Sequence, residues 1–395
     1  MSAPDDADAP YTLRVLDRVR EVPAATWDAM LREESSPFLE HAWLDMLEQT
    51  GCVGDDTGWM PAHLSLWRGD ALVAVAPSYI KGHSEGEFVF DWNWADLAQR
   101  MGGRYYPKVL LAVPFTPATG DRVLVAPGMD RALATRLVAG AAREWCGRLK
   151  GGGVHVLFPR EPAEDGASAW EQAGYLRRDG FQFHWFRHGA TTFDEYLGRF
   201  TSKQRNQIKR ELRGVKDRGV TVETLPPLGH TPEIARAMHG FYVSTIENHG
   251  RWGRMYLSEA FFDAVVDRFR DRLAWVVARD RTGEPVAGAF NVVKDRRLYG
   301  RYWGASVEVP YLHFVVCYYA GIRHAIEHGL DVFEPGAGGE HKRARGFVPT
   351  LTHSFHWLTD GRMRSVIGQH LERERALVRQ HVASEGRDDG DDGPT

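Results

Sequence analysis

Apolar and polar residues alternate along this chain in two halves that follow nearly the same order. In the first half, residues spaced as in helices precede an alternating pattern typical of strands, and a longer helical stretch and closing strands follow. The expected helices lie at 27–30, 41–49, 130–149 and 163–173, and the expected strands at 63–67, 71–81, 122–125, 154–158 and 176–187. Asp130 precedes the long helix as its expected N-cap.

The second half repeats this order of elements. Its expected helices lie at 232–247, 258–269 and 313–328, and its expected strands at 273–279, 285–293, 297–303, 330–333 and 347–357. Helices, a strand meander, a further helix, a strand and a closing strand, found twice, predict a duplicated α+β unit. We expect each unit to hold a mixed, mostly antiparallel sheet flanked by helices.

The expected domains follow from this repeat, because a chain of 395 residues exceeds the usual size of one hydrophobic core. We expect a first domain at 11–190 and a second domain at 191–365 that contains a basic helix at 199–218. A disordered N-terminus at 1–10 precedes them, and a C-terminal helix at 366–386 and a disordered acidic tail at 387–395 follow.

Composition narrows the class of protein. The net charge of −4 argues against a general nucleic-acid binder, although it leaves room for a local basic patch. The cysteines lack the spacing of a metal site or a disulfide framework, so we expect no metal and a reducing cytoplasm. We expect no signal peptide and no membrane span. No dinucleotide fingerprint, Walker loop, HExxH or nucleophile elbow is present in the sequence.

The most informative segment is 330–357, where a short apolar strand leads into a glycine-rich turn. Glu340 and His341 follow the turn and stand beside Lys342 and Arg345. Glycines let a backbone approach a ligand closely. A carboxylate and an imidazole beside cations suit a site that binds an anionic substrate and moves a proton. The alternative is a solvated loop with its charges in water.

A second charged segment, 199–218, is rich in Lys and Arg and compatible with a helix. Arg205, Lys209 and Arg213 recur at helical spacing and should share one face. With Lys203, they are expected to contact the phosphates of a polyanionic donor. The alternative is again a solvated surface helix.

Aromatic residues and carboxylates alternate in the block FVFDWNWAD and shortly after it. Such a pattern is typical of a groove for a sugar or peptide, in which rings supply flat contact area and carboxylates bind hydroxyls or amines. The residues expected to line it are Asp91, Trp92, Trp94, Asp96, Tyr105, Tyr106 and Lys108. The alternative for the tryptophans is an ordinary place in the core.

Two further residues are candidates in the second half. His313 stands at the start of a helix, where the dipole favours a neutral imidazole, and serves either as a cap or as a functional group. Tyr299 and Tyr302 point to opposite faces of one strand, so only one of them can line a pocket. We expect Tyr302 to do so.

The repeated order of elements resembles the GNAT acyltransferase fold. Two such units, with the basic residues SKQRNQIKR before the second meander, resemble the Fem-type peptidoglycan aminoacyltransferases. Further blocks are similar to a Fem-like GNAT family of predicted N-acyltransferases, and the similarity runs from about Leu13 to Glu374. These blocks are 36–39 (SPFL), 86–96 (GEFVFDWNWAD), 105–117 (YYPKVLLAVPFTP), 298–304 (LYGRYWG), 312–314 (LHF), 317–319 (CYY) and 334–347.

The resemblance implies that two adjacent strands splay apart and hold the acyl carbonyl between them. An amine then attacks directly while a base takes its proton. It also implies aminoacyl-tRNA or acyl-CoA as co-substrate and no permanently bound cofactor. The best candidate for a turn that binds the pyrophosphate of coenzyme A is 301–306 (RYWGAS), which departs from the family pattern at Ser306. Glu308 would repel a pyrophosphate, and Pro310 lacks a donor.

We therefore expect a cytoplasmic tandem-GNAT acyltransferase that transfers an acyl or aminoacyl group to the amine of a peptide, amino acid or cell-wall precursor, with tRNA as a partner if it carries the donor. The expected site residues are Glu340 or His341 as base, Glu334 as its orienting group, Tyr302 as a further catalytic residue, and Arg301, His313, Lys342 and Arg345 as substrate-binding residues. Two alternatives remain open: an acyl-CoA-dependent N-acetyltransferase, and a non-catalytic protein that recognises cell-wall precursors.

Overall fold

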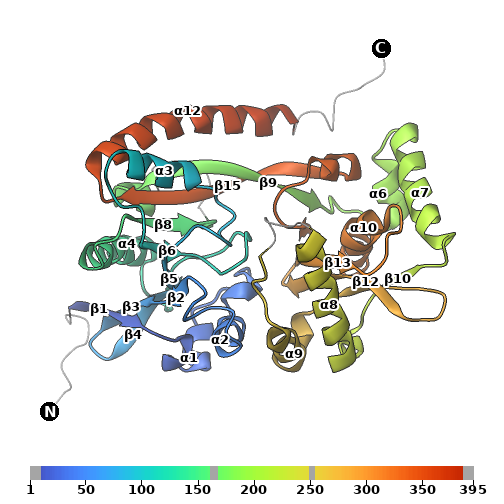
Figure 1. The fold of residues 1–395 in the computed structure, drawn as a ribbon, viewed down its shortest axis with the longest axis horizontal. Coiled ribbons are helices and arrows are strands. Elements are labelled where there is room, and N and C mark those ends of the chain that lie inside the picture. The colour runs from blue at the N-terminus through green and yellow to red at the C-terminus, as the bar shows by residue number, and fades with distance from the viewer. Residues whose placement is uncertain (1–9, 161–167, 249–253, 386–395) are drawn as a thin grey trace. The chain divides into compact units, whose positions relative to one another are not determined.

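The computed structural model describes residues 10–160, 168–248 and 254–385, and Figure 1 draws them as a ribbon. The chain divides into two compact units. Unit 1 consists of the described residues up to Phe181 together with Leu351–Ser384. Unit 2 consists of the described residues of Gln182–Thr350, joined by Glu385. The expected limits of 1–10 and 387–395 lie outside the described residues, apart from residue 10.

Unit 1 contains a small antiparallel sheet, in the order β1-β3-β4-β7, and a larger mixed sheet in which β2, β5, β6 and β8 are neighbours. Its strands are β1 (Tyr11–Leu16), β2 (Trp59–Pro61), β3 (His63–Arg68), β4 (Ala71–Ala76), β5 (Ser78–Lys81), β6 (Lys108–Leu111), β7 (Leu124–Val125) and β8 (Gly153–Leu157). Its helices are α1 (Ala24–Asp28), α2 (His41–Gln49), α3 (Trp92–Arg100), α4 (Arg131–Arg148), α5 (Ala169–Gln172) and α12 (Gly361–Glu385).

Helix α4 illustrates how the sequence builds unit 1. The side chain of Asp130 accepts a hydrogen bond from the N–H of Leu133, as expected of an N-cap. Val138 and Ala142 recur at helical spacing, are completely buried, and pack in one cluster with the strand residues Val154 and Val156. The helix therefore covers the larger sheet and connects its two parallel strands, β6 and β8.

Unit 2 contains one mixed sheet in the order β10-β11-β12-β13-β14-β9. Its strands are β10 (Thr221–Thr224), β11 (Val276–Arg279), β12 (Pro285–Lys294), β13 (Arg297–Ala305), β14 (Val332–Glu334) and the last part of β9 (Leu176–Phe186). Its helices are α6 (Phe193–Gly198), α7 (Ser202–Lys216), α8 (Pro232–Asn248), α9 (Glu259–Arg268), α10 (Leu312–Phe314), a π-helical turn (Val315–Tyr319), α11 (Ala320–Glu327) and the 3-10 helix η8 (Glu340–Arg345).

The two units share one topological plan. Each has a parallel strand pair, β6 with β8 in unit 1 and β13 with β14 in unit 2, joined by a helical crossover. In each, the next strand is antiparallel and comes from the other half of the sequence. The last part of β15 (Phe347–Leu358) pairs with β8, and the last part of β9 pairs with β14. The predicted α+β class with a repeated unit is confirmed.

This exchange of strands shifts the domain limits away from those expected at 11–190 and 191–365. The structure places residues after Phe181 in unit 2 and returns Leu351–Ser384 to unit 1. The reason is that Ser354 to Leu358 complete the sheet of unit 1. The C-terminal helix begins at Gly361, before the expected 366, and buries Met363 against the core of the same unit.

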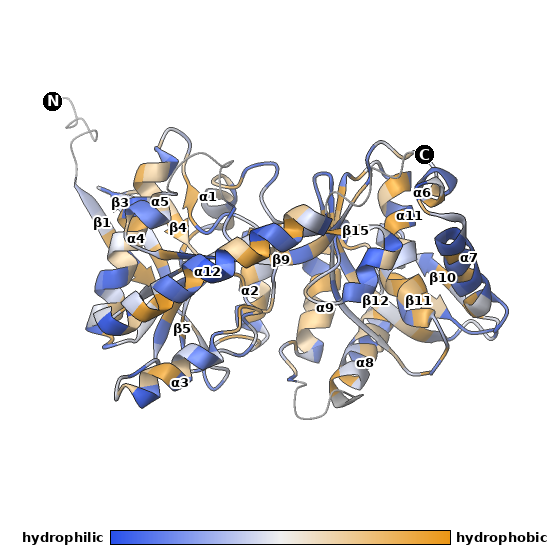
Figure 2. Cartoon of the chain, turned by 90° about the horizontal axis from the view of Figure 1, so that it is seen from above, coloured by the Kyte–Doolittle hydropathy of each residue, from blue (hydrophilic) through white to orange (hydrophobic). Residues whose placement is uncertain are grey.

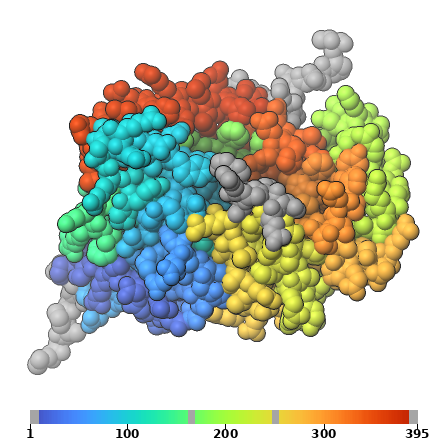
Figure 3. All heavy atoms as spheres, viewed as in Figure 1, coloured from blue at the N-terminus to red at the C-terminus, as the bar shows by residue number. Residues whose placement is uncertain are grey.

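The structure also differs from the expected elements at single positions. The strand expected at 71–81 is broken into β4 and β5, and the block expected to form a groove contains helix α3. The turn expected at 301–306 is mostly strand, because β13 continues to Ala305. The basic segment is helical as predicted. Figure 2 shows α7 mostly in the colour of hydrophilic residues, and Figure 3 shows α6 and α7 on the surface of unit 2.

Candidate active site

The parallel strands of unit 2 separate at one point, and a pocket lies there. Pairing between β13 and β14 ends with Tyr299 and Glu334, whereas β13 continues along β12. The register between β12 and β13 shifts at this point, so that Arg301 is an extra residue between Gly300 and Tyr302. The bulge and the end of pairing leave a cavity of about 240 Å³. Its polar wall residues include Asn291, Arg301, Tyr302, His313, His341 and Lys342.

His341 occupies the pocket wall at the start of η8. Its Nε2 lies 2.8 Å from the hydroxyl oxygen of Tyr318. Burial, followed by the nearby cations Arg345 and Lys342, lowers the pKa of His341 below its ordinary 6.5. Gly339 has a φ of +87°, and a Cβ there would lie 2.9 Å from the imidazole. The glycine-rich turn thus lets a neutral imidazole lie against the backbone.

Lys342 is the cation of the pocket wall. It is 3% exposed, and its ammonium donates to the carbonyl oxygens of Gly336 (2.8 Å) and Ala337 (3.4 Å). Burial lowers its pKa to about 8. Lys342 therefore carries a positive charge at neutral pH. Its role in binding an anionic group stays a prediction.

His313 lines the same pocket from the helical crossover. Its ring lies 4.7 Å from that of Trp303 and 5.7 Å from that of His341, measured between centroids. Burial lowers its pKa to about 4, helped by the positive charges nearby, so this imidazole is neutral as well. The π-helical turn that follows brings Cys317 and Tyr318 to the pocket, and such turns are frequent at functional sites.

The charge of Arg345, which the sequence predicts to bind substrate, is paired within the protein. Its Nη2 donates to both carboxylate oxygens of Glu211, at 2.9 and 3.0 Å, and Tyr319 donates to the same carboxylate at 2.5 Å. Its Nη1 donates to the carbonyl oxygen of His341 at 2.7 Å. Arg345 instead fixes the turn that carries His341, and it is outside the pocket wall.

The two candidate carboxylates also lie outside the pocket wall. Glu334 accepts a hydrogen bond from Arg297 at 2.9 Å, so it is engaged there rather than with the expected base. Glu340 is exposed at the first position of η8. Of the residues predicted in this segment, the structure brings His341 and Lys342 together with Tyr302, Arg301 and His313.

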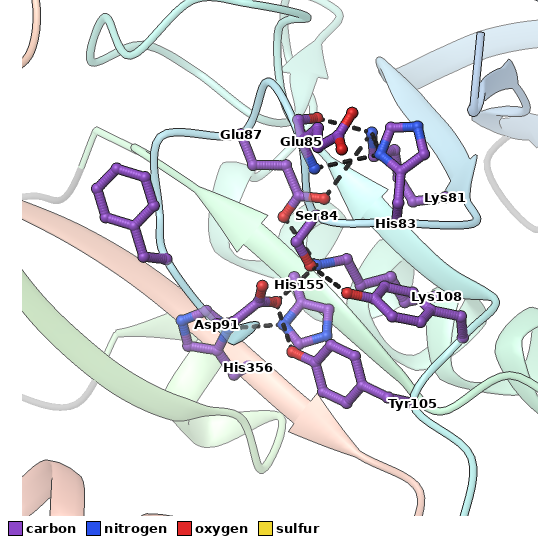
Figure 4. Close-up of polar contacts among 12 residues, drawn as sticks. Lys81, His83, Ser84, Glu85, Glu87, Asp91, Tyr105, Lys108, His155 and His356 are labelled. Carbon is purple, nitrogen blue, oxygen red and sulfur yellow. Dashed lines mark hydrogen bonds and ion pairs between the residues drawn. The ribbon is translucent and has the colours of Figure 1, made fainter. Parts of the chain in front are cut away.

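Three residues predicted in the first half, Asp91, Tyr105 and Lys108, belong to a buried ion cluster, shown in Figure 4. Lys108 is completely buried and donates to Ser84 (2.8 Å), Glu87 (2.8 Å) and Asp91 (2.6 Å). The hydroxyl of Tyr105 also donates to Asp91, at 2.5 Å. Burial alone would raise the pKa of Asp91, but Lys108 outweighs it and the pKa is lowered. These charges are paired with each other inside the core of unit 1.

The expected aromatic groove is not formed by these residues. Trp94 is buried, whereas Trp92 and Asp96 are exposed on another face of α3. Tyr106 is half-buried, and its hydroxyl lies 2.8 Å from that of Ser84. Successive residues of a helix point about 100° apart, so Trp94 points away from Trp92 and Asp96, which are four positions apart and share a face.

The cations predicted on the basic helix lie mostly in solvent. Lys203, Lys209 and Arg213 are exposed on α7. Arg205 is half-buried and donates to the carbonyl oxygen of Phe200 at 2.9 Å. The buried face of the helix carries Ile208, Glu211 and Val215 instead.

Unit 1 also has a pocket at the carboxyl ends of its parallel strands. The cavity measures about 420 Å³, and its wall includes Arg32, Arg122, Arg131 and Arg160. Arg122 donates to backbone carbonyl oxygens, whereas the guanidinium Nε of Arg160 has no hydrogen-bond partner among the described residues. Sequence reasoning missed this cluster, because its arginines are far apart in the chain.

Asn291, Tyr318 and Glu211 were also missed, although each leaves a trace in the sequence. Asn291 is a polar residue inside an apolar strand, and Glu211 is an acidic residue inside a basic helix. Tyr318 belongs to the block CYY, which carries part of the family resemblance. The sequence alone indicates no role for this tyrosine. Each trace becomes specific only when its spatial partner is known.

Each unit joins a parallel strand pair to a helical crossover, and in unit 2 a pocket lies at the point where the pair separates. The chain belongs to the FemAB-like family, described as peptidoglycan biosynthesis/recognition, whose model matches residues 18–388. The predicted Fem-like class is thereby confirmed. A search of curated proteins finds no match to the chain.

Solved structures agree on the fold. The structure of FemX is 14% identical, with 88% of this chain and 98% of that chain covered and a TM-score of 0.51. The C-terminal domain of a putative lysylphosphatidylglycerol synthetase from Agrobacterium fabrum is 12% identical, with 88% and 95% covered and a TM-score of 0.54. L-PGS from Bacillus licheniformis is 12% identical, with 87% and 98% covered and a TM-score of 0.50.

Neither a metal-binding group nor a membrane-spanning helix is found in the part of the chain that the structure describes. No group of three or more His, Cys, Asp or Glu side chains there is arranged to hold a metal ion. None of the helices there is long and apolar enough to cross a membrane.

Proposed function

We propose that this protein transfers an acyl or aminoacyl group to an amine, and that the transfer takes place in the pocket of unit 2. The observation that carries the proposal is the neutral imidazole of His341 in the pocket wall, hydrogen-bonded to Tyr318. A neutral imidazole can accept the proton that an amine loses as it attacks a carbonyl. Membership of the FemAB-like family supports the class of reaction.

In this proposal, the amine nitrogen attacks the acyl carbonyl carbon while the pocket holds both groups in contact. The proposal requires the tautomer in which Nε2 of His341 donates its hydrogen to the Tyr318 oxygen, 2.8 Å away. The lone pair on Nδ1 then takes the amine proton. The bond between the carbonyl carbon and the donor oxygen or sulfur then breaks. The imidazolium returns its proton to that leaving atom.

The remaining wall residues have supporting roles. The ammonium of Lys342 binds an anionic part of one substrate. Tyr302 and Arg301 border the space where the acyl group enters beside β13. Of the two candidates for the base, we prefer His341 to Glu340, because Glu340 is exposed and does not line the pocket.

The donor belongs to one of two chemical classes. The exposed cations of α7 favour a polyanion, and aminoacyl-tRNA is therefore our first choice. Acyl-CoA is the second choice, because residues Arg301 to Ala305 belong to a paired strand and their N–H groups do not form a pyrophosphate-binding turn. The acceptor would be an amine-bearing peptide, amino acid or cell-wall precursor in the cytoplasm.

The test begins by finding the donor. Purified protein is incubated with an amine-bearing cell-wall precursor peptide and either aminoacyl-tRNA or acyl-CoA, and mass spectrometry detects the new amide. With the active donor, His341→Asn should lower the rate constant for transfer by roughly 10²- to 10⁴-fold. Glu340→Gln, the control on the same turn, should leave it within a factor of about three.

The pH dependence gives an independent check. Because the pKa of His341 is lowered below 6.5, the rate should be constant at neutral pH and should fall only when the pH drops below that value. Equal rates for wild type and His341→Asn would show that the reaction does not need this imidazole. Binding of the peptide without turnover with either donor would favour a recognition protein instead.

A further inference from the structure

Asn291 places an amide in a strand that is otherwise apolar and in the wall of the unit 2 pocket. Its neighbours in β12, Phe290 and Val292, are completely buried. Asn291 itself is 1% exposed, and its Nδ2 has no hydrogen-bond partner among the described residues. A buried amide without a partner is destabilising, because it has lost its hydrogen bonds to water without replacement.

The fold places this amide at the point where β13 leaves β14. Asn291 pairs with Gly300, the residue before the extra residue Arg301. A Cβ on Gly300 would lie 3.4 Å from Oδ1 of Asn291 and 3.2 Å from Cα of Pro335. Glycine at position 300 therefore lets the two strands pack closely beside the amide, and Asn291 lies in the wall of the same cavity as His341.

We propose that the amide of Asn291 donates a hydrogen bond to the oxygen of the acyl carbonyl and stabilises it during transfer. This inference rests on the proposed function. When the amine nitrogen bonds to the carbonyl carbon, the electron pair of the C=O π bond moves onto the oxygen. The amide then donates to an oxygen that carries a full negative charge. This hydrogen bond is stronger than the one that the amide makes to the neutral carbonyl oxygen of the substrate.

The reaction is completed when the electron pair on the carbonyl oxygen moves back, and no further reactant is needed. The pair on the oxygen re-forms the C=O bond, and the bond from carbon to the donor oxygen or sulfur breaks. The amine proton goes to His341 and from there to the leaving atom. A half-turn about the terminal side-chain bond exchanges Oδ1 and Nδ2 of Asn291, so the NH₂ group can face the cavity with the rest of the side chain unmoved.

Asn291→Leu tests the inference, because leucine keeps a similar shape and removes the unpaired amide. The expected result is a fall in kcat of roughly 10²- to 10³-fold with KM within a factor of about three. The melting temperature should be equal to that of wild type or higher, because a buried polar group without a partner has been removed. Gln99→Leu, an exposed amide on α3, is the matched control and should leave both quantities unchanged.

Asn291→Asp identifies which end of the amide acts. A carboxylate has a similar shape but cannot donate and repels the negative oxygen, so kcat should fall at least as far as in Asn291→Leu. Wild-type kcat in either variant would overturn the inference. So would a loss of activity in Asn291→Leu that is accompanied by a lower melting temperature, because the amide would then be structural.

The test of Asn291 can be distinguished from the test of His341 as the base. If His341→Asn keeps wild-type activity while Asn291→Leu loses it, the assignment of the base fails and that of Asn291 stands. If the reverse pattern is found, the inference on Asn291 fails alone.

Discussion

Replacing Glu87 with glutamine tests whether the buried ion cluster of unit 1 titrates near neutral pH. Burial raises the pKa of Glu87 from its ordinary 4.5 to about 7, despite the opposing charge of Lys108. The folded state therefore holds this proton more tightly than the unfolded chain does. The free energy of unfolding should decrease as the pH rises from about 4.5 to about 7.

The magnitude follows from the two pKa values. One pKa unit corresponds to about 1.4 kcal/mol, so the whole window is worth about 3 kcal/mol at most. Asp91 affects the free energy of unfolding in the opposite sense, because its pKa is lowered from the ordinary 3.8. Its contribution to stability is lost only as the pH falls below that value. Its effect falls outside the window of Glu87.

The assay compares urea unfolding of wild type and Glu87→Gln at pH 5 and pH 8. Hydrogen exchange of peptides from β5 and β6 assigns the transition to unit 1. Relative to wild type, the variant should gain between about 2 and 3 kcal/mol of unfolding free energy from pH 5 to pH 8, because it lacks the titrating group. Asp96→Asn, an exposed carboxylate on α3, is the control for the substitution.

A constant difference between wild type and Glu87→Gln at both pH values would refute this reasoning. It would show that Glu87 keeps the same charge throughout and that its pairing with Lys108 outweighs burial. The cluster would then be a set of permanently ionised partners, and its stability would respond to pH only at the acid and alkaline extremes.

Two further predictions concern α7 and β13. If α7 binds a polyanionic donor, replacing Lys203, Arg205 and Lys209 with alanine should weaken binding of the donor and flatten the dependence of its affinity on salt. Fluorescence titration at several ionic strengths measures both. An unchanged salt dependence would mean that these cations are only solvated. Gly304→Ala should destabilise the protein by about 3 kcal/mol in urea unfolding, because its Cβ would lie 1.7 Å from the carbonyl oxygen of Phe241. Gly240→Ala on α8 is its control, since a Cβ there meets nothing within 4 Å; equal stability of both variants would contradict the close contact.

The order of elements was predictable because local signals determine it. Asp130 caps α4, and short runs of apolar and aromatic residues mark β12 and β13, so each element can be read from a short window of sequence. The glycine-rich turn was likewise recognisable, and it does bring His341 and Lys342 to the pocket.

The partners of individual side chains were not predictable, because they come from distant parts of the chain. The sequence predicts an anion-binding role for Arg345, whereas in the structure this side chain pairs with Glu211, which lies 134 positions away in the sequence. The sequence also predicts that Lys108 and Asp91 line a groove, whereas their charges are paired with each other in the core. A charged residue with a buried partner and one with a substrate look the same in a linear sequence.

The last part of β15 has a consequence for the synthesis of the chain. As a ribosome makes the protein from its N-terminus, β8 emerges long before Ser354–Leu358, the residues that pair with it. Until then, β8 keeps an open edge whose N–H and C=O groups can pair with another nascent chain. The first unit can therefore reach its final sheet only after Ser354–Leu358 have been translated, and a chaperone that shields strand edges would matter most during that interval.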